Sequence, residues 1–173
     1  MQAASHALPT QFLSADEVAA VAGNLIPMRP ARFERSREVI ENWWKRTFGI
    51  RSAMPVMDNG SGLSREERIS PEALANLLRH ASRHPQGERF ASSLSVAGVN
   101  GTAARMARAP GSAARGNAQL KTGTLKDVTG IAGYVNAGHG ARYAVVGFIN
   151  HPNAPAARPA LEALVEWTAG QPD

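Results

Sequence analysis

Three strand-like segments in a row limit what the C-terminal half of this 173-residue chain can fold into. They lie near residues 118–125, 129–137 and 142–150, and are rich in the β-branched and aromatic residues that favour strands. Gly138-His139-Gly140 is typical of a tight hairpin turn, which joins antiparallel neighbours. The last segment is nearly all apolar, as is typical of a strand covered on both faces. We therefore predict an antiparallel meander.

The remaining segments predict helices around this sheet. A closing helix is expected over 157–169, with Leu161, Leu164, Val165 and Trp167 available to pack on the strands. Upstream, apolar spacing predicts an amphipathic helix over 32–48, stopped by Gly49. Ser70-Pro71 marks the start of another helix that runs to about residue 84. The fold class is therefore α+β.

Other segments give weaker or irregular signals. Residues 1–30 are expected to be a loose leader with one short helix from Ser14, where a capping box stands, to Ala22. Residues 53–69 are expected to form a loop and 90–96 a short helix or irregular segment. The glycine- and arginine-rich stretch 100–118 gives no definite element.

Composition narrows the function classes. The chain has no cysteine, and no apolar run approaches the roughly 20 residues of a membrane span. His80 and His84 are spaced for a shared metal, but no third ligand is evident, so we expect no metal and no cofactor. A net charge of +5 leaves nucleic-acid binding as a weak alternative. The arginines are scattered without an aromatic platform, so we expect no nucleic-acid partner.

Lys121-Thr122-Gly123-Thr124 carries the clearest chemical signal. A lysine offers a positive charge to a carboxylate and a threonine offers a hydroxyl donor. A glycine beside them lets another backbone approach and pair with the strand edge. Together they suit an extended peptide with a free C-terminal carboxylate. The alternative is an ordinary edge strand whose lysine discourages aggregation.

The flanking motifs add a family resemblance. Asp58-Asn59-Gly60-Ser61-Gly62-Leu63-Ser64-Arg65 lies upstream, as does Val96-Ala97-Gly98-Val99-Asn100-Gly101-Thr102, and Ala132-Gly133-Tyr134 follows the lysine strand. In this order and spacing the chain, from about Phe33 to Trp167, resembles the C-terminal part of class C penicillin-binding proteins. These are serine D-alanyl-D-alanine carboxypeptidases and endopeptidases of peptidoglycan.

The resemblance implies a partial serine β-lactamase/DD-peptidase-like transpeptidase fold over residues 31–173. It implies a substrate-binding site made by Lys121, Thr122, Gly123 and Thr124, with Leu63 and Arg65 facing the same pocket. Arg65 would meet the carboxylated end of the peptide stem's side chain; the alternative is that it only ties its own loop together. The partners implied are a peptidoglycan stem peptide or a β-lactam, bound weakly, in the periplasm, although residues 1–10 lack a signal-peptide pattern.

Two motifs of that family's chemistry are missing. No serine stands three residues before Lys45, Lys121 or Lys126, so there is no Ser-x-x-Lys. No asparagine has a serine two positions before it, so there is no Ser-x-Asn, and we identify no catalytic residue. The chain is expected to be either the substrate-binding C-terminal part of a serine-type D-Ala-D-Ala carboxypeptidase or a noncatalytic module that binds peptidoglycan peptides or a partner. Without N-terminal strands, the segment 142–150 would leave a bare apolar edge, which predicts self-association.

Overall fold

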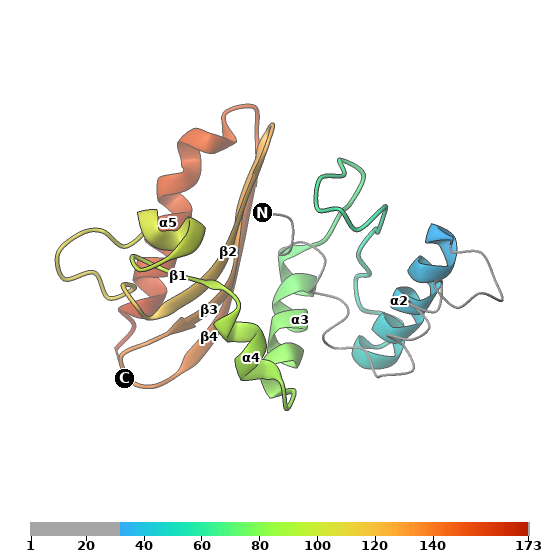
Figure 1. Ribbon diagram of the computed structural model, residues 1–173, viewed down its shortest axis with the longest axis horizontal. Helices are drawn as coiled ribbons and strands as arrows, with labels where there is room; N and C mark the ends of the chain where they lie inside the picture. The colour runs from blue at the N-terminus through green and yellow to red at the C-terminus, as the bar shows by residue number, and fades with distance from the viewer. Residues whose placement is uncertain (1–31, 173) are drawn as a thin grey trace. The chain divides into compact units, whose positions relative to one another are not determined.

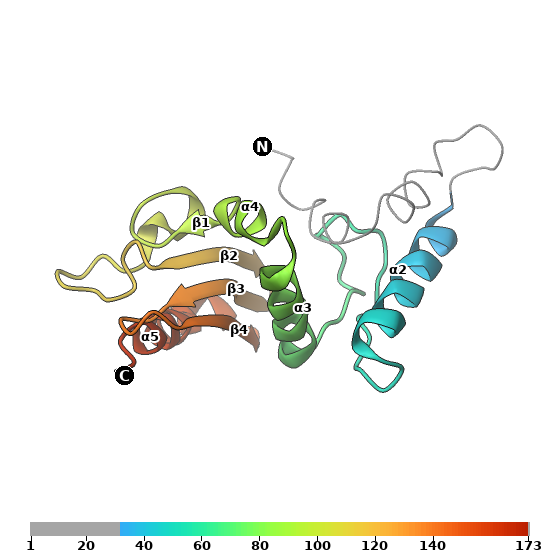
Figure 2. The same cartoon turned by 90° about the horizontal axis from the view of Figure 1, so that it is seen from below.

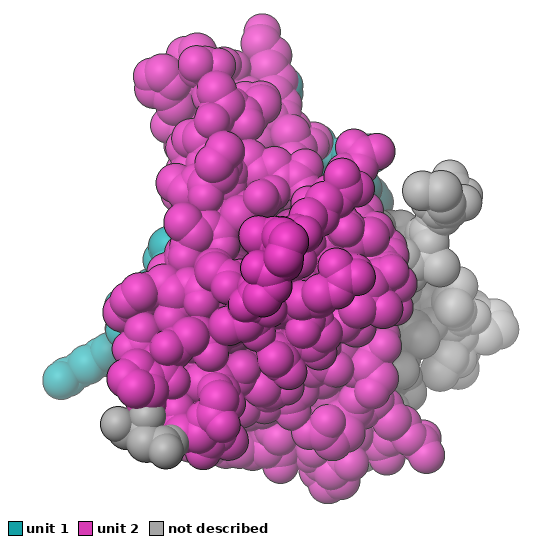
Figure 3. Space-filling model, turned by 90° about the vertical axis from the view of Figure 1, so that its left-hand side faces the viewer, with its two compact units in different colours: residues 1–73 teal, residues 74–173 magenta. Residues whose placement is uncertain are grey.

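A computed structural model describes residues 32–172 of the chain. The chain divides into two compact units, residues 1–73 and residues 74–173 (Figure 3). Each unit is described by itself below. The short helix expected over 14–22 lies outside the described residues.

The described part of the first unit is organised by one long helix. Helix α2 spans Phe33–Phe48 and ends at Gly49, whose φ of 85° favours glycine (Figure 1). Its buried residues, Trp43 and Trp44, form an edge-on pair, and the Trp44 indole Nε1 donates a 3.0 Å hydrogen bond to the Ser52 hydroxyl. The predicted helix is confirmed, but Phe33 is 62% exposed and is not part of its buried stripe.

The loop predicted over 53–69 is also confirmed. Its only β-type pairing among the described residues is a single bridge between Val56 and Arg68. The turn around Gly60 is held by polar contacts, including a hydrogen bond from the Gly60 N–H to the Glu67 carboxylate. Local polar contacts therefore hold this loop, in place of the hydrogen bonds of a β-ladder.

The second unit is built on a four-stranded antiparallel sheet with strand order β1-β2-β3-β4. The strands are β1 (Ser95–Val96), β2 (Ala118–Leu125), β3 (Val128–Asn136) and β4 (Arg142–Asn150). The predicted meander of three strands is confirmed, and the hairpin between β3 and β4 closes with a 2.8 Å hydrogen bond from Ala137 N–H to the Ala141 carbonyl. Strand β1 is an addition at the other edge; it was missed because two residues carry no periodicity.

Helix α5 (Arg158–Ala169) covers one face of this sheet (Figures 1 and 2). Its Leu161 and Val165 join a core made with Leu120, Ile131, Val135 and Val145 from the strands. Two details differ from the sequence-based expectation. Trp167 is 65% exposed and does not pack into the core, because it lies on the helix flank away from Leu161 and Val165. Strand β4 fully buries only Val145 and leaves most of its other side chains half-buried, so its faces are less completely covered than its apolar sequence indicated.

Helices α3 (Pro71–Arg83) and α4 (Gly87–Ser92) complete the helical part. As predicted, Ser70 caps α3: its hydroxyl accepts a 3.1 Å hydrogen bond from the Ala73 N–H. Within the second unit, the residues of these helices lie on the sheet face opposite α5 (Figures 1 and 2). The irregular segment expected over 90–96 is therefore the end of α4 followed by β1.

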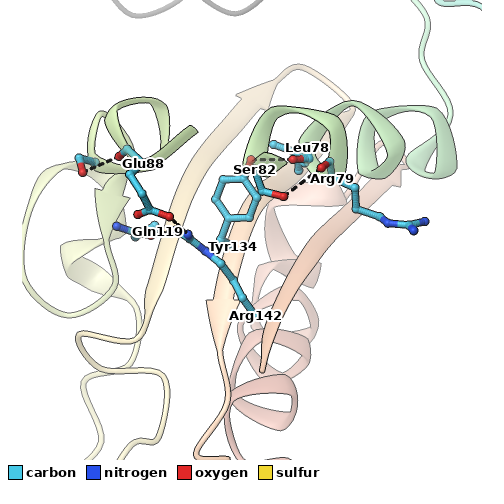
Figure 4. Close-up of polar contacts among 8 residues, drawn as sticks. Leu78, Arg79, Ser82, Glu88, Gln119, Tyr134 and Arg142 are labelled. Carbon is cyan, nitrogen blue, oxygen red and sulfur yellow. Dashed lines mark hydrogen bonds and ion pairs between the residues drawn. The ribbon is translucent and has the colours of Figure 1, made fainter. Parts of the chain in front are cut away.

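Tyr134 is the centre of the contacts between these helices and the sheet (Figure 4). Its hydroxyl donates a 2.8 Å hydrogen bond to the Leu78 carbonyl, and Phe90 meets its ring edge-on. Burial raises the pKa of Tyr134 to about 12. The Arg142 guanidinium lies 4.6 Å from the ring centroid and also contacts Glu88 at 2.5 Å and the Gln119 side chain at 2.6 Å.

The connection between β1 and β2 is held against α5 by Glu166. This carboxylate accepts hydrogen bonds from the Ser112 hydroxyl at 2.5 Å and from the Ala113 N–H at 2.7 Å. The Ser112 bond, with help from the backbone N–H groups, lowers the pKa of Glu166. Two short helices, η3 (Gly101–Arg105) and η4 (Ala154–Ala157), lie before β2 and after β4, respectively.

Candidate functional site

The outer edge of β2 is open beyond its first half. Strand β1 pairs only with Gln119 and Leu120, while β3 pairs with the whole of β2 on the other side. From Lys121 to Leu125, the described part of the chain provides no strand on that edge. Open backbone donors and acceptors along such an edge can accept an extended peptide as an additional strand.

Lys121 is the cation of this edge. It is exposed, and its ammonium contacts the carbonyl of Thr122. Among the described residues no carboxylate lies within ion-pair distance of it. The charge is therefore available to a carboxylate that comes from outside the chain.

Thr122 and Thr124 lie on the same face of β2, because strand side chains alternate with a period of two. The Thr122 hydroxyl lies 2.8 Å from the hydroxyl of Thr102, to which it donates a hydrogen bond. The Thr124 hydroxyl lies 3.5 Å from that of Thr129 on β3, which is a long and weak contact. Each hydroxyl of the predicted site thus has a second threonine beside it.

Gly123 lies between these threonines and is not required by the packing. A Cβ added there would meet no atom within 4 Å, whereas one added at Gly133 would lie 2.0 Å from the Gln119 carbonyl oxygen. The absence of a side chain at Gly123 therefore leaves free space beside the open edge. This is the condition that close approach of a second backbone needs.

Leu63 and Arg65 belong to the loop of the first unit, whereas Lys121 belongs to the second. Leu63 is 72% exposed and Arg65 is also exposed. The Arg65 carbonyl accepts a hydrogen bond from the Arg68 guanidinium, so the backbone of Arg65 is held within this loop. That these two residues share a pocket with Lys121 remains a prediction.

Sequence reasoning missed two members of this region, Thr102 and Thr129. Thr129 is 3% exposed and supports Thr124 from the neighbouring strand. Thr102 comes from η3, 20 residues before Thr122. Only the register of β2 with β3 and the docking of η3 bring these hydroxyls together, and no sequence pattern signals either contact.

His80 is partly buried, which lowers its pKa, and the neighbouring His84 and Arg83 charges lower it further. Across residues 32–172, no group of three or more His, Cys, Asp or Glu side chains is arranged to hold a metal ion. None of the helices over the same range is long and apolar enough to cross a membrane.

Comparison with known proteins places this chain in a family. The chain is similar to the D-alanyl-D-alanine carboxypeptidase of Actinomadura sp. (strain R39), with 38% identity over 93 residues that make up 51% of this chain and 17% of the relative. It is also similar to the D-alanyl-D-alanine carboxypeptidase DacB of Haemophilus influenzae, with 29% identity over 122 residues, 70% of this chain and 25% of the relative. The chain therefore spans a quarter or less of the curated relatives it matches.

Solved structures agree with the sequence relatives. Penicillin binding protein 4 (dacB) from H. influenzae superimposes with a TM-score of 0.71 at 23% identity, over 95% of this chain and 39% of that one. A second structure of that protein, complexed with a β-lactam, gives a TM-score of 0.63 at 26% identity, over 83% of this chain and 34% of that one. The model of the D-Ala-D-Ala carboxypeptidase 3 (S13) family matches residues 13–171. This chain is a member of the D-Ala-D-Ala carboxypeptidase 3 (S13) family.

Proposed function

We propose that this chain supplies the carboxylate-binding strand of a site for peptidoglycan peptides that end in D-Ala-D-Ala. The observation that carries the proposal is the edge of β2 that no strand of the described residues covers, where the exposed Lys121 and the hydroxyls of Thr122 and Thr124 follow one another around Gly123. The relatives' names, and the β-lactam bound to one of them, support the same substrate class. In the complete site, Leu63 and Arg65 would contact the peptide stem. Arg65 would meet the carboxylated end of the stem's side chain.

The proposed chemistry is binding without acyl transfer. A serine peptidase of this type needs an activated serine, and the sequence contains neither Ser-x-x-Lys nor Ser-x-Asn. The strand can anchor the terminal carboxylate while its backbone pairs with the peptide. One charged pair open to water contributes only about 0.2–1 kcal/mol, so binding by this chain alone is expected to be weak.

Titration with a diacetyl-Lys-D-Ala-D-Ala peptide, followed by NMR, tests this proposal. We expect chemical-shift changes along residues 121–125 and a Lys121→Ala variant that binds about two- to fivefold more weakly, as expected for one exposed ion pair. Lys126→Ala is the matched control. Lys126 is exposed in the adjacent turn, so this substitution removes the same charge outside the site. Equal effects of the two substitutions, or shift changes confined to other parts of the chain, would overturn the proposal.

A second candidate function is a noncatalytic module that binds a partner protein or peptidoglycan peptides outside any enzyme. The missing nucleophile motifs favour it over a complete enzyme. An open β2 edge serves either role, because strand addition depends on backbone groups. For both roles we propose a periplasmic location, in line with a peptidoglycan ligand.

The opposite edge of the sheet carries a separate prediction. Strand β4 pairs with β3 alone among the described residues, and Tyr143 is 39% exposed. An apolar strand with one unpaired edge is a template for another chain, so we expect self-association through β4. Light scattering should show a dimer or larger species. A charge placed in this strand should disrupt the association, but Val145→Lys would also disturb the core to which Val145 belongs. Tyr143→Lys is therefore the better variant and should restore a monomer.

The oligomeric state in solution tests whether the chain associates through β4. A monodisperse monomer of the wild-type chain, with amides along residues 143–149 protected from exchange, would show that the edge is already covered. A dimer that persists unchanged in Tyr143→Lys would place the interface elsewhere.

A further inference from the structure

Thr102 makes the shorter of the two hydroxyl–hydroxyl contacts at the candidate site. Its hydroxyl lies 2.8 Å from that of Thr122, the usual length of an O–H···O hydrogen bond. The two residues come from different elements, η3 and β2. The hydroxyl oxygens of the other pair, Thr124 and Thr129, are 3.5 Å apart, compared with 2.8 Å for Thr102 and Thr122. Thr122 is therefore the hydroxyl that the protein holds more firmly.

Several local contacts place Thr102 at this point. The Asn100 side-chain oxygen accepts a 2.7 Å hydrogen bond from the Val96 N–H, and the Asn100 N–H donates back to the Val96 carbonyl at 3.1 Å. Gly101 follows with a φ of 55°, and a Cβ added there would lie 2.2 Å from the Ser95 hydroxyl. Only glycine permits this approach of η3 to β1. The Asn100-Gly101 pair thus fixes the next residue, Thr102, beside β2.

We propose that Thr102 is a positioning residue for the hydroxyl with which Thr122 binds the ligand carboxylate. This inference rests on the proposed function and adds a residue to it. A threonine hydroxyl has one proton to donate and can also accept. Without ligand, Thr122 donates its proton to Thr102. When a carboxylate arrives, Thr122 turns its proton to the carboxylate and accepts the proton of Thr102.

The resulting chain of two hydrogen bonds runs from Thr102 through Thr122 to the carboxylate. No covalent bond forms or breaks, and both oxygens keep their hydrogen-bond partners. Each bond in such a chain polarises the next, which strengthens the one that reaches the carboxylate. Thr102 is exposed, so its hydroxyl can rotate without disturbing a packed core. Its effect on the ligand passes entirely through Thr122.

Two substitutions test this role. Thr102→Val keeps the branched shape and removes the hydroxyl, whereas Thr102→Ser keeps the hydroxyl and serves as the matched control. Loss of one supporting hydrogen bond should weaken binding of diacetyl-Lys-D-Ala-D-Ala by about three- to tenfold in Thr102→Val. Thr102→Ser should bind like the wild type. The C-terminal amide of the same peptide has no carboxylate, and its weaker binding should be equal in all three proteins.

A second readout does not depend on the ligand. Three-bond NMR couplings report the χ1 angle of Thr122, which should occupy one rotamer in the wild type and Thr102→Ser and several in Thr102→Val. A single rotamer in Thr102→Val, unchanged affinity, or an equal loss for the acid and the amide would overturn the role of Thr102. If the wild type binds neither peptide, the proposed function fails, and the rotamer measurement still decides whether Thr102 positions Thr122.

Discussion

Incubation of this chain with excess benzylpenicillin is expected to leave its intact mass unchanged, and a D-Ala-D-Ala peptide is expected to release no D-alanine. Acylation needs a serine within hydrogen-bond reach of a base. Removal of a nucleophile costs on the order of a millionfold in rate in serine proteases, and the chain lacks both the Ser-x-x-Lys serine and its lysine. Intact-mass spectrometry after incubation measures the result directly.

Ser61 and Ser64, the two serines of the motif Asp58 to Arg65, are occupied by local structure. The Ser61 hydroxyl accepts a 3.1 Å hydrogen bond from the Leu63 N–H, and the Ser64 hydroxyl accepts one of 3.1 Å from the Glu66 N–H. Both contacts are typical of serine turns, in which the hydroxyl stabilises the backbone. A stoichiometric mass increase that maps to Ser61, Ser64 or any other serine would show that this chain has a nucleophile and a base outside the known motifs.

Gly133→Ala is expected to unfold the second unit. Gly133 lies opposite Leu120 on β2 and Val145 on β4, in the middle of the sheet. A Cβ at this position would lie 2.0 Å from the Gln119 carbonyl oxygen and 2.9 Å from the Leu120 Cα. Both atoms are backbone, so no side-chain rotation relieves the clash and the strands must separate. We expect a loss of about 4 kcal/mol or more, a large part of the roughly 5–15 kcal/mol that stabilises a typical domain.

Gly123→Ala is the matched control on the neighbouring strand. It replaces glycine by the same residue in the same sheet, but its Cβ would meet no atom within 4 Å. Its thermal and urea unfolding should stay within about 1 kcal/mol of the wild type, while peptide binding at the β2 edge weakens. Gly133→Ala protein that unfolds like the wild type would show that β2 and β3 are paired in a different register.

The sheet was the part of the fold most open to prediction. Strands β2, β3 and β4 each span eight or nine residues of strand-favouring sequence, and turn residues separate β3 from β4. Strand β1 has two residues and exists only because it pairs with Gln119 and Leu120. Its formation depends on a contact more than 20 residues away along the chain, which local pattern does not contain.

The sequence by itself determined the order of the strands, the main helices, and the candidate cation and hydroxyls from Lys121 to Thr124. These follow from local periodicity, turn chemistry and residue type, which act within a few positions. Only the tertiary structure decided that no strand among residues 32–172 pairs with the outer edge of β2 beyond Leu120, that Trp167 lies outside the core, and that Thr102 meets Thr122. Those features depend on register and on which surfaces meet, and both are set by side chains far apart along the chain.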